Sequence, residues 1–255
     1  MLLAIDIGNT NIVFGIKQED EWINSWRIQT DPLKMADEYE VIFRSLLTAG
    51  KVCKNEISHV IMSSVVPSLN HQFNEMLNSL IPEAELISVN PEIYSNLPIK
   101  VLNPYQIGAD LVCNSLAAFK KYGALSMVID FGTALTFTTI GKNSEIRGVA
   151  IAPGLQTAVS ALAGKTAQLP QIHLVPPPSV LGENTVHAIQ SGIVYGFAGL
   201  VDSIIERTQT ELNEKLTVVA TGGLSTVIAP ITQHVKTIEP MLTLNGLIEI
   251  YAYCG

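Results

Sequence analysis

The sequence predicts an α/β protein built from two related halves, and two observations carry this prediction. Short apolar runs, typical of buried strands, alternate along the chain with segments of helical periodicity. In addition, one pattern occurs twice, about half a chain apart: an apolar strand ends in Asp, and an apolar residue, a Gly and a nearby Thr follow. The copies are residues 2–11 and 126–136. More strand-type sequence follows each copy, which predicts a strand, a tight turn and a second strand.

The first half alternates between strands and helices. It begins with strand-type sequence, and the two helices that follow have one apolar face each. Pro67 opens the second of these helices, and Gly50 ends the first, which Asp37 could cap. The expected elements are strands over 2–28 with a turn at 18–21, a helix over 37–49, a strand over 59–66, a helix from residue 67 and a strand over 85–89.

The second half repeats this alternation after a loop around Asn103-Pro104. Asp110 stands at the start of a helix that runs to about Tyr122. Residues 170–182, which include three consecutive prolines, are expected to form a loop whose Ile172, Leu174 and Val175 pack down. The other expected elements are a strand ending at residue 130, a hairpin to 151, a helix toward 169, a helix over 185–212, a strand over 216–223, a helix near 224, a strand over 235–238 and a helix over 242–253.

Composition excludes several classes of protein. The 255 residues, 47% of them hydrophobic, can bury one large or two modest cores. Acidic residues outnumber basic ones by 23 to 15, and no Lys/Arg cluster occurs, which argues against nucleic acid or an anionic membrane as partner. The three cysteines are scattered, and no apolar run approaches the length of a membrane span. We therefore expect reduced thiols and a cytoplasmic protein.

The repeated pattern suits phosphate chemistry. A carboxylate at a strand end, such as Asp6 or Asp130, can hold a cation or orient Mg²⁺-bound phosphates. The glycine lets the turn backbone approach a phosphate, and neighbouring hydroxyl and N–H groups can bond its oxygens. The alternative is structural: each Asp accepts N–H groups of its own turn, and Gly8 to Asn11 form a plain hairpin.

Two further stretches are weaker candidates. Asp110 could act as a base that accepts a proton from a substrate hydroxyl, but it could also serve only the start of its helix, where a lowered pKa would be expected. Thr221-Gly-Gly223, at a strand end before a helix, fits close approach of the backbone to a ligand. The five histidines lack metal-ligand spacing, and the chain contains no P-loop motif.

The long helix after Asn184 carries Gly192, Gly196 and Gly199 on one face. Three glycines lower helix stability, so they need an explanation. Either another helix, from this chain or from a partner subunit, approaches that face closely, or the helix is bent or broken. The sequence leaves both possibilities open.

Taken in order, these motifs resemble those of type III pantothenate kinases, which belong to the acetate-kinase/sugar-kinase/Hsp70/actin superfamily. The resemblance covers nearly the whole chain. Its most specific parts are the coupling of Gly108-Ala-Asp110 to Asp130-Phe-Gly-Thr133, and Gly182-Glu-Asn-Thr185 followed by Gln190-Ser-Gly192. The other matching stretches are 6–10, 63–67, 103–104, 151–154, 166–170 and 221–224.

The resemblance implies ATP-dependent phosphorylation of pantothenate, the first step of coenzyme A synthesis. It implies two duplicated ribonuclease-H-like (actin-like ATPase) domains, residues 1–120 and 121–255, with a nucleotide cleft between them. Asp110 would be the catalytic proton acceptor. It further implies Mg²⁺, a monovalent cation (K⁺ or NH₄⁺) bound at Asp130, and a homodimer. The implied nucleotide-binding residues are Asp6, Ile7, Gly8, Asn9, Thr10, Asn11, Ile12, Val13 and Thr133, and the pantothenate-binding residues are Gly108, Ala109, Asp110, Leu111 and Thr185.

The chain departs from the family pattern on the acceptor side. Leu111 stands where the family usually has Arg, which removes a cationic partner for the pantothenate carboxylate, and Thr138 stands where an Asp is usual. Loss of such a charged hydrogen bond costs about 1.5–3 kcal/mol. Two alternatives therefore accompany the kinase hypothesis: a kinase for a related, less anionic acceptor, and a catalytically weak nucleotide-binding paralogue with a regulatory or accessory role.

Overall fold

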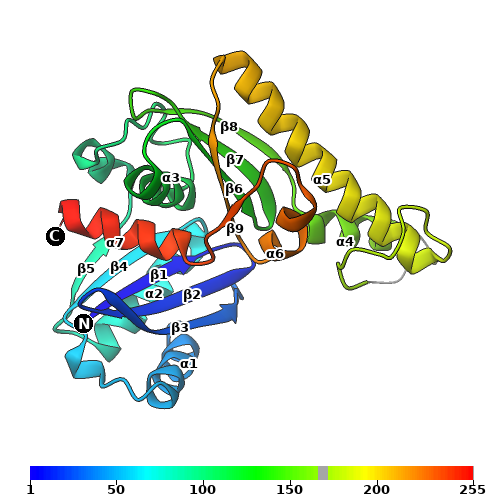
Figure 1. Ribbon diagram of the computed structural model, residues 1–255. Coiled ribbons are helices and arrows are strands. Elements are labelled where there is room, and N and C mark those ends of the chain that lie inside the picture. Colours follow the sequence, from blue (N-terminus) through cyan, green and yellow to red (C-terminus); the bar gives the residue numbers. More distant parts are fainter. Residues whose placement is uncertain (166–171, 255) are drawn as a thin grey trace. The chain divides into compact units, whose positions relative to one another are not determined.

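The computed structural model describes residues 1–165 and 172–254, and the chain divides into two compact units (Figure 1). Unit 1 comprises Met1–Ala117 together with the segment from Thr243 on, and unit 2 comprises Ala118–Leu242. The sequence analysis divided the chain at residue 120 and kept the last helix in the second half. By its contacts this helix groups with unit 1.

The unit 1 sheet has five strands in the order β3-β2-β1-β4-β5. Its centre is β1, which pairs antiparallel with β2 and parallel with β4. Four of the six β1 residues are buried, so this strand runs through the core of the unit. The strands are β1 (Leu2–Ile7), β2 (Asn11–Gln18), β3 (Glu21–Gln29), β4 (His59–Ser64) and β5 (Glu85–Ser88), close to the expected elements.

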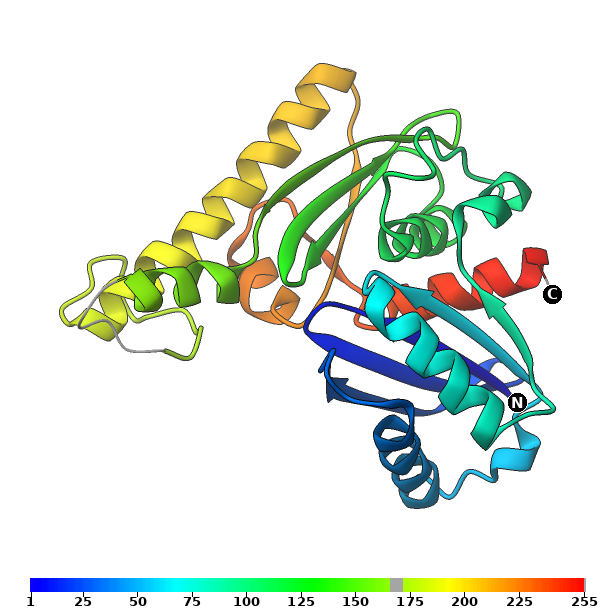
Figure 2. The same ribbon diagram turned by 180° about the vertical axis from the view of Figure 1, so that it is seen from behind.

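Helices cover both faces of this sheet, as Figures 1 and 2 show for α1 and α2 on one side and α7 on the other. On the first face, Phe14 of β2 stacks on Phe43 of α1 with ring centroids 4.8 Å apart. On the other face, a Cβ added at Gly246 of α7 would overlap the backbone of Cys113 in α3, so these two helices touch closely. The helices are α1 (Ala36–Ala49), α2 (Pro67–Leu80), α3 (Ala109–Tyr122) and α7 (Leu242–Cys254).

The start of α1 differs from the expectation that Asp37 caps it. Met35 is the N-cap residue, and its backbone N–H donates to Glu38 Oε2 at 2.9 Å. Asp37 lies inside the first turn, where an acidic side chain still interacts favourably with the helix dipole. The Glu38 side chain therefore does the capping that the sequence analysis gave to Asp37.

The unit 2 sheet has the order β10-β9-β6-β7-β8 and repeats the arrangement of unit 1. Its centre, β6, pairs antiparallel with β7 and parallel with β9, as β1 does with β2 and β4. The two copies of the sequence pattern thus form equivalent central strands. The strands are β6 (Ser126–Phe131), β7 (Ala134–Ile140), β8 (Ile146–Pro153), β9 (Thr217–Thr221) and β10 (Thr237–Ile238).

Three helices belong to unit 2: α4 (Leu155–Lys165), α5 (Thr185–Leu212) and α6 (Ser225–Ile228). The last residues expected for α4, and the motif at 166–170, lie outside the described residues. The helix α6 has only one turn, because the chain passes into a 3₁₀ turn at Ala229–Ile231 that contains a proline. In the loop before α5, Leu174 is buried as expected, but Val175 is 51% exposed.

The helix α5 is continuous over 28 residues, so the bent or broken alternative is wrong. One side of it, including Val194, Val201 and Ile205, belongs to the unit 2 core. By length and composition alone α5 could also cross a membrane, which the sequence analysis did not expect. A single such helix is weak evidence, because core helices of soluble proteins pass the same test.

Candidate functional site

Asp6 lies near the end of β1, where the parallel register places it beside Ser63 of β4. The Ser63 side chain is 1% exposed, and its hydroxyl donates to Asp6 Oδ1 at 2.7 Å. Asp6 itself is half-buried. A hydrogen bond to a buried, charged acceptor is among the stronger ones in proteins, so it fixes the orientation of this carboxylate.

The turn after β1 is tight and its polar side chains are exposed. The Gly8 N–H donates to the Asn11 carbonyl at 3.0 Å, and a Cβ on Gly8 would lie 3.0 Å from that same oxygen. Thr30 holds the turn from one side, because its hydroxyl donates to the Gly8 carbonyl at 2.6 Å and its N–H to the Thr10 carbonyl at 2.9 Å. Hydrogen bonds therefore fix the backbone of this turn, and a side chain at Gly8 would crowd it.

The predicted nucleotide segment, residues 6–13, divides into two kinds of position. Ile7 and Ile12 are fully buried and belong to the unit 1 core, so their side chains anchor the turn. The residues between them, Asn9 to Asn11, are exposed. Side chains and N–H groups of this exposed part are the ones that a phosphate could reach.

Asp110 occupies the first turn of α3, where its Oδ1 accepts the Leu111 N–H at 2.9 Å. Burial nonetheless raises the pKa of this carboxyl above its ordinary value of 3.8, although the hydrogen bond with Leu111 opposes the shift. The expectation of a lowered pKa at this helix start was therefore wrong. Desolvation outweighs the helix end, and a carboxylate with a raised pKa is a better proton acceptor.

The segment before and after Asp110 is closely packed. A Cβ on Gly108 would overlap Asp110 Oδ1, so glycine is required if the carboxylate keeps this position. Ala109 and Leu111 are 7% and 8% exposed. The Leu111 side chain thus lies in an apolar environment, and of the four predicted acceptor-site residues here only Asp110 has a polar side chain.

Cys113, one helical turn after Asp110, lies near both candidate site carboxylates of unit 1, Asp6 and Asp110. Its thiol is fully buried, and burial raises its pKa well above the ordinary range, with the charges of Asp6 and Asp110 acting in the same direction. The Ser63 hydroxyl, which bonds Asp6, interacts with this thiol as well. Tyr94 is the fifth member, because burial and the charges of Cys113 and Asp110 raise its pKa. Unit 1 therefore gathers a buried polar cluster from four distant parts of the chain.

The sequence analysis placed Cys113 in the core as a reduced thiol but gave neither Cys113 nor Tyr94 a place in a site. Tyr94 lies in a 3₁₀ turn at Pro91–Asn96, and no local pattern marks it. Cys113 follows Asp110 at helical spacing, which was the one signal available. The contact of Asp6 with Ser63 depends on strand order, which spacing within one segment does not reveal.

In unit 2, Asp130 lies near the end of β6, and the backbone encloses it closely. A Cβ on Gly222, which has φ +88°, would stand 2.5 Å from Asp130 Oδ1. Across the antiparallel register Asp130 faces Thr136, whose Oγ1 is buried without a hydrogen-bond partner among the described residues. Side chains at paired positions share one face of a sheet, so this orphan hydroxyl and the carboxylate are neighbours.

Thr133 lies in the exposed turn after β6, and a second close backbone approach holds this turn. The Gly154 N–H donates to the Thr133 carbonyl at 3.1 Å, and the Thr157 hydroxyl donates to the same oxygen at 2.8 Å. A Cβ on Gly154 would overlap the carbonyl of Gly132. The Thr133 side chain itself stays exposed.

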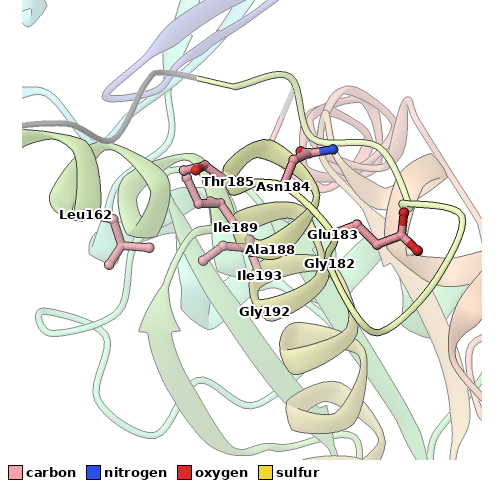
Figure 3. A pocket seen from close by; sticks show the side chains of 9 residues that line it. All are labelled: Leu162, Gly182, Glu183, Asn184, Thr185, Ala188, Ile189, Gly192 and Ile193. Carbon is pink, nitrogen blue, oxygen red and sulfur yellow. The ribbon is translucent and has the colours of Figure 1, made fainter.

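Thr185, the remaining predicted substrate residue, lines an open pocket of about 710 Å³ at the start of α5 (Figure 3). Asn184 caps the helix there and accepts the His187 N–H at 2.9 Å. The pocket combines an apolar wall with polar groups at its rim. Its lining residues are Leu162, Gly182, Glu183, Asn184, Thr185, Ala188, Ile189, Gly192 and Ile193.

Within residues 1–165 and 172–254, no group of three or more His, Cys, Asp or Glu side chains is arranged to hold a metal ion.

Solved structures with the same fold include the activator of the 2-hydroxyisocaproyl-CoA dehydratase from Clostridium difficile, solved with bound ADPNP. Its TM-score is 0.51 at 12% identity, and the match covers 99% of this chain and 94% of that one. The Lmo2764 protein from Listeria monocytogenes has a TM-score of 0.55 at 13% identity and is covered to 99%. These likenesses confirm the predicted actin-like α/β fold and, at such low identity, nothing more.

The sequence comparisons are closer. The family model described as type III pantothenate kinase matches residues 2–207. The type III pantothenate kinase of Moorella thermoacetica is 44% identical over 251 residues, which is 98% of both chains. That of Citrifermentans bemidjiense is 40% identical over the same share of both chains. This chain therefore belongs to the type III pantothenate kinase family.

Proposed function

We infer that this protein is an ATP-dependent kinase that phosphorylates pantothenate in the first step of coenzyme A synthesis. The observation that carries this inference is family membership along the whole chain, at 44% identity to the Moorella thermoacetica protein. ATP supplies the phosphoryl group, and Mg²⁺ offsets charge on its phosphates. The proposals on individual residues below rest on their surroundings in each unit.

In unit 1, we propose that the segment Asp6–Val13 holds the nucleotide phosphates. The tight turn at Gly8 supports this, because its backbone is fixed by Thr30 and a Cβ there would already meet another backbone oxygen. Exposed N–H, amide and hydroxyl groups follow at Asn9, Thr10 and Asn11. A rigid turn with unshielded donors is the arrangement that phosphate-binding loops use.

We propose that Asp110 accepts the proton of the pantothenate hydroxyl. The raised pKa of its carboxyl group supports this role, since a stronger base takes the proton more readily. Gly108, Ala109 and Leu111 would shape the acceptor site around it. Thr185 is a further proposed pantothenate-binding residue. In a loose phosphoryl-transfer transition state the proton leaves late, so orientation of the hydroxyl is the main contribution of such a base.

We propose that the monovalent cation binds at Asp130 and that Thr133 contacts the nucleotide phosphates. The buried Thr136 hydroxyl next to Asp130 supports the first proposal, because a buried polar group without a partner is costly unless a ligand satisfies it. A hydroxyl and a carboxylate are suitable oxygen donors for K⁺ or NH₄⁺. Thr136→Val, which keeps the shape, should raise the K⁺ concentration needed for half-maximal activity; an unchanged K⁺ dependence would contradict a cation at this position.

The test of the function is ADP release with ATP, Mg²⁺ and K⁺, with and without pantothenate. We expect release that depends on pantothenate in the wild type and falls sharply in Asp110→Asn. ATP binding without pantothenate-dependent release would instead favour a regulatory, catalytically weak paralogue. Wild-type turnover in Asp110→Asn would leave the kinase in place but remove Asp110 as the base.

The buried Leu111 favours a second candidate acceptor. Because an apolar side chain stands at this position, 8% exposed, it offers the pantothenate carboxylate no charged partner. A pantothenate amide, which lacks that negative charge, would not need one. Comparing kcat/KM for pantothenate and its N-alkyl amides decides between them: a preference for the acid would refute the less anionic acceptor.

We propose that the protein is a cytoplasmic homodimer. The exposed glycines of α5 support association, since a Cβ on Gly192, Gly196 or Gly199 would meet no atom of the described residues within 4 Å. Among the described residues, no other helix packs against this face of α5. Of the explanations that the sequence left open for the three glycines, association with a partner subunit remains. Sedimentation of the wild type and of Gly196→Leu tests it: a wild-type monomer, or a variant dimer of equal affinity, would contradict the proposal.

A further inference from the structure

Ser63 is a deeply buried polar residue that contacts a proposed site carboxylate. It lies at the end of β4, in parallel register with Asp6, and only 1% of it is exposed. Its hydroxyl donates to Asp6 Oδ1 at 2.7 Å. Burial of a hydroxyl beside a carboxylate is favourable only if the two are bonded, so this pair is strongly oriented.

The next residue on the same strand gives the contrast. Ser64 points to the opposite side of the strand, and its hydroxyl serves the local chain only, accepting the Val66 N–H at 3.1 Å and donating to the Val66 carbonyl at 3.2 Å. Of these two adjacent serines, one therefore holds a turn and the other holds a carboxylate. Sequence alone does not distinguish them.

Ser63 also faces α3. Its hydroxyl interacts with the buried Cys113 thiol, which lies one helical turn from Asp110. Because both Cys113 and Ser63 are buried, α3 covers Ser63 on this side.

We propose that Ser63 is a positioning residue for the nucleotide side of the reaction, which acts by fixing the Asp6 carboxylate through its hydroxyl. This inference rests on the proposed role of Asp6 with the nucleotide phosphates. Removing the hydroxyl takes away this buried donor, so the Asp6 carboxylate would be held less firmly in its orientation. The requirement for MgATP should then rise, while the requirement for pantothenate should not change.

The experiment is a double-mutant cycle on the full-length enzyme with Ser63→Ala, Asp6→Asn and both together. For Ser63→Ala we expect the KM for MgATP to rise by about ten- to a hundredfold, the range for loss of a hydrogen bond to a charged group. The KM for pantothenate should stay at the wild-type value. In the Asp6→Asn background, Ser63→Ala should add little, because the bond to a charged oxygen is already gone.

Two variants make the result specific. Ser64→Ala removes the neighbouring hydroxyl and should match the wild type in both KM values. Ser63→Cys keeps the size but donates weakly, so its KM for MgATP should fall between those of wild type and Ser63→Ala. Thermal unfolding of each variant shows that it is folded. If Ser63→Ala does not fold, the near-isosteric Cys variant carries the test.

The outcomes separate the two proposals. A normal KM for MgATP in Ser63→Ala or Ser63→Cys, with Asp6→Asn impaired, would overturn the positioning role and leave the role of Asp6 intact. An equal effect of Ser63→Ala in the wild-type and Asp6→Asn backgrounds would also overturn it, since Ser63 would then act independently. Wild-type behaviour of Asp6→Asn would refute the proposed role of Asp6 itself.

Discussion

Replacing Gly222 by Ala tests how closely the chain encloses Asp130. Two costs add at this position. The residue has φ +88°, which costs an L-amino acid about 1–2 kcal/mol. The new Cβ would stand 2.5 Å from Asp130 Oδ1 and 2.7 Å from both the N and C atoms of Phe131, an overlap with backbone that costs about 1–3 kcal/mol. We expect a total loss of about 2–5 kcal/mol in the free energy of unfolding.

Gly123 provides the matched control in the same unit. Its φ is +80°, but a Cβ there would meet no atom of the described residues within 4 Å. Gly123→Ala should therefore lose only the backbone share, about 1–2 kcal/mol. Urea unfolding of both variants measures the difference. An equal loss in the two, or a larger loss in Gly123→Ala, would show that the reasoning from the close approach to Asp130 is wrong.

The same substitution has a functional consequence, since the added methyl group displaces the Asp130 carboxylate. If Asp130 holds the monovalent cation, Gly222→Ala should raise the K⁺ concentration for half-maximal activity, and Gly123→Ala should not. If Gly222→Ala loses stability but keeps the wild-type K⁺ dependence, the packing argument would stand. The proposed role of Asp130 in cation binding would then be wrong.

Three further predictions concern unit 1. Asp110→Asn should lower kcat by about 10²- to 10⁴-fold, the usual contribution of a general base, with a normal far-UV circular dichroism spectrum; a normal kcat would contradict that role. Because burial raises the pKa of Asp110, the folded state holds this proton more tightly than the unfolded state does. The contribution of Asp110 to the free energy of unfolding should therefore decrease as pH rises from 3.8 through the raised pKa. Urea titrations at several pH values should show this decrease in the wild type and not in Asp110→Asn. Gly246→Ala should lower the melting temperature by about 2–4 °C for each kcal/mol of overlap with Cys113, whereas Gly148→Ala, with no described atom near its Cβ, should change it little.

Much of the fold could be predicted because its central strands are buried and its helices have one apolar face. The repeated strand pattern correctly indicated two sheets with equivalent centres, β1 and β6. Errors arose where a tertiary contact decided the result. Val175 follows an apolar pattern but is exposed, and α6 ends after one turn because a proline-containing 3₁₀ turn follows.

The sequence could predict site residues only where the residue pattern within one short segment indicates the function. The turn at Gly8 and the helix start at Asp110 have such signals. Neither the contact of Ser63 with Asp6 nor the place of Tyr94 near Asp110 can be derived from spacing, because strand order and helix packing create them. The direction of the Asp110 pKa was wrong for the same reason. A helix start lowers the pKa of an exposed carboxylate, but the sequence did not show how deeply this one is buried.

The two candidate site carboxylates of unit 1, Asp6 and Asp110, have surroundings that suit different tasks. Asp6 accepts a hydrogen bond from a buried hydroxyl, which fixes the direction of the carboxylate, as a group that orients phosphates requires. Asp110 is desolvated, which disfavours its charged form and makes it the better proton acceptor. Burial raises the pKa of the nearby Cys113 thiol well above its ordinary value, so this group adds no third charge beside them. The surroundings of the two carboxylates therefore match the two proposed roles, because a buried donor holds one and burial desolvates the other.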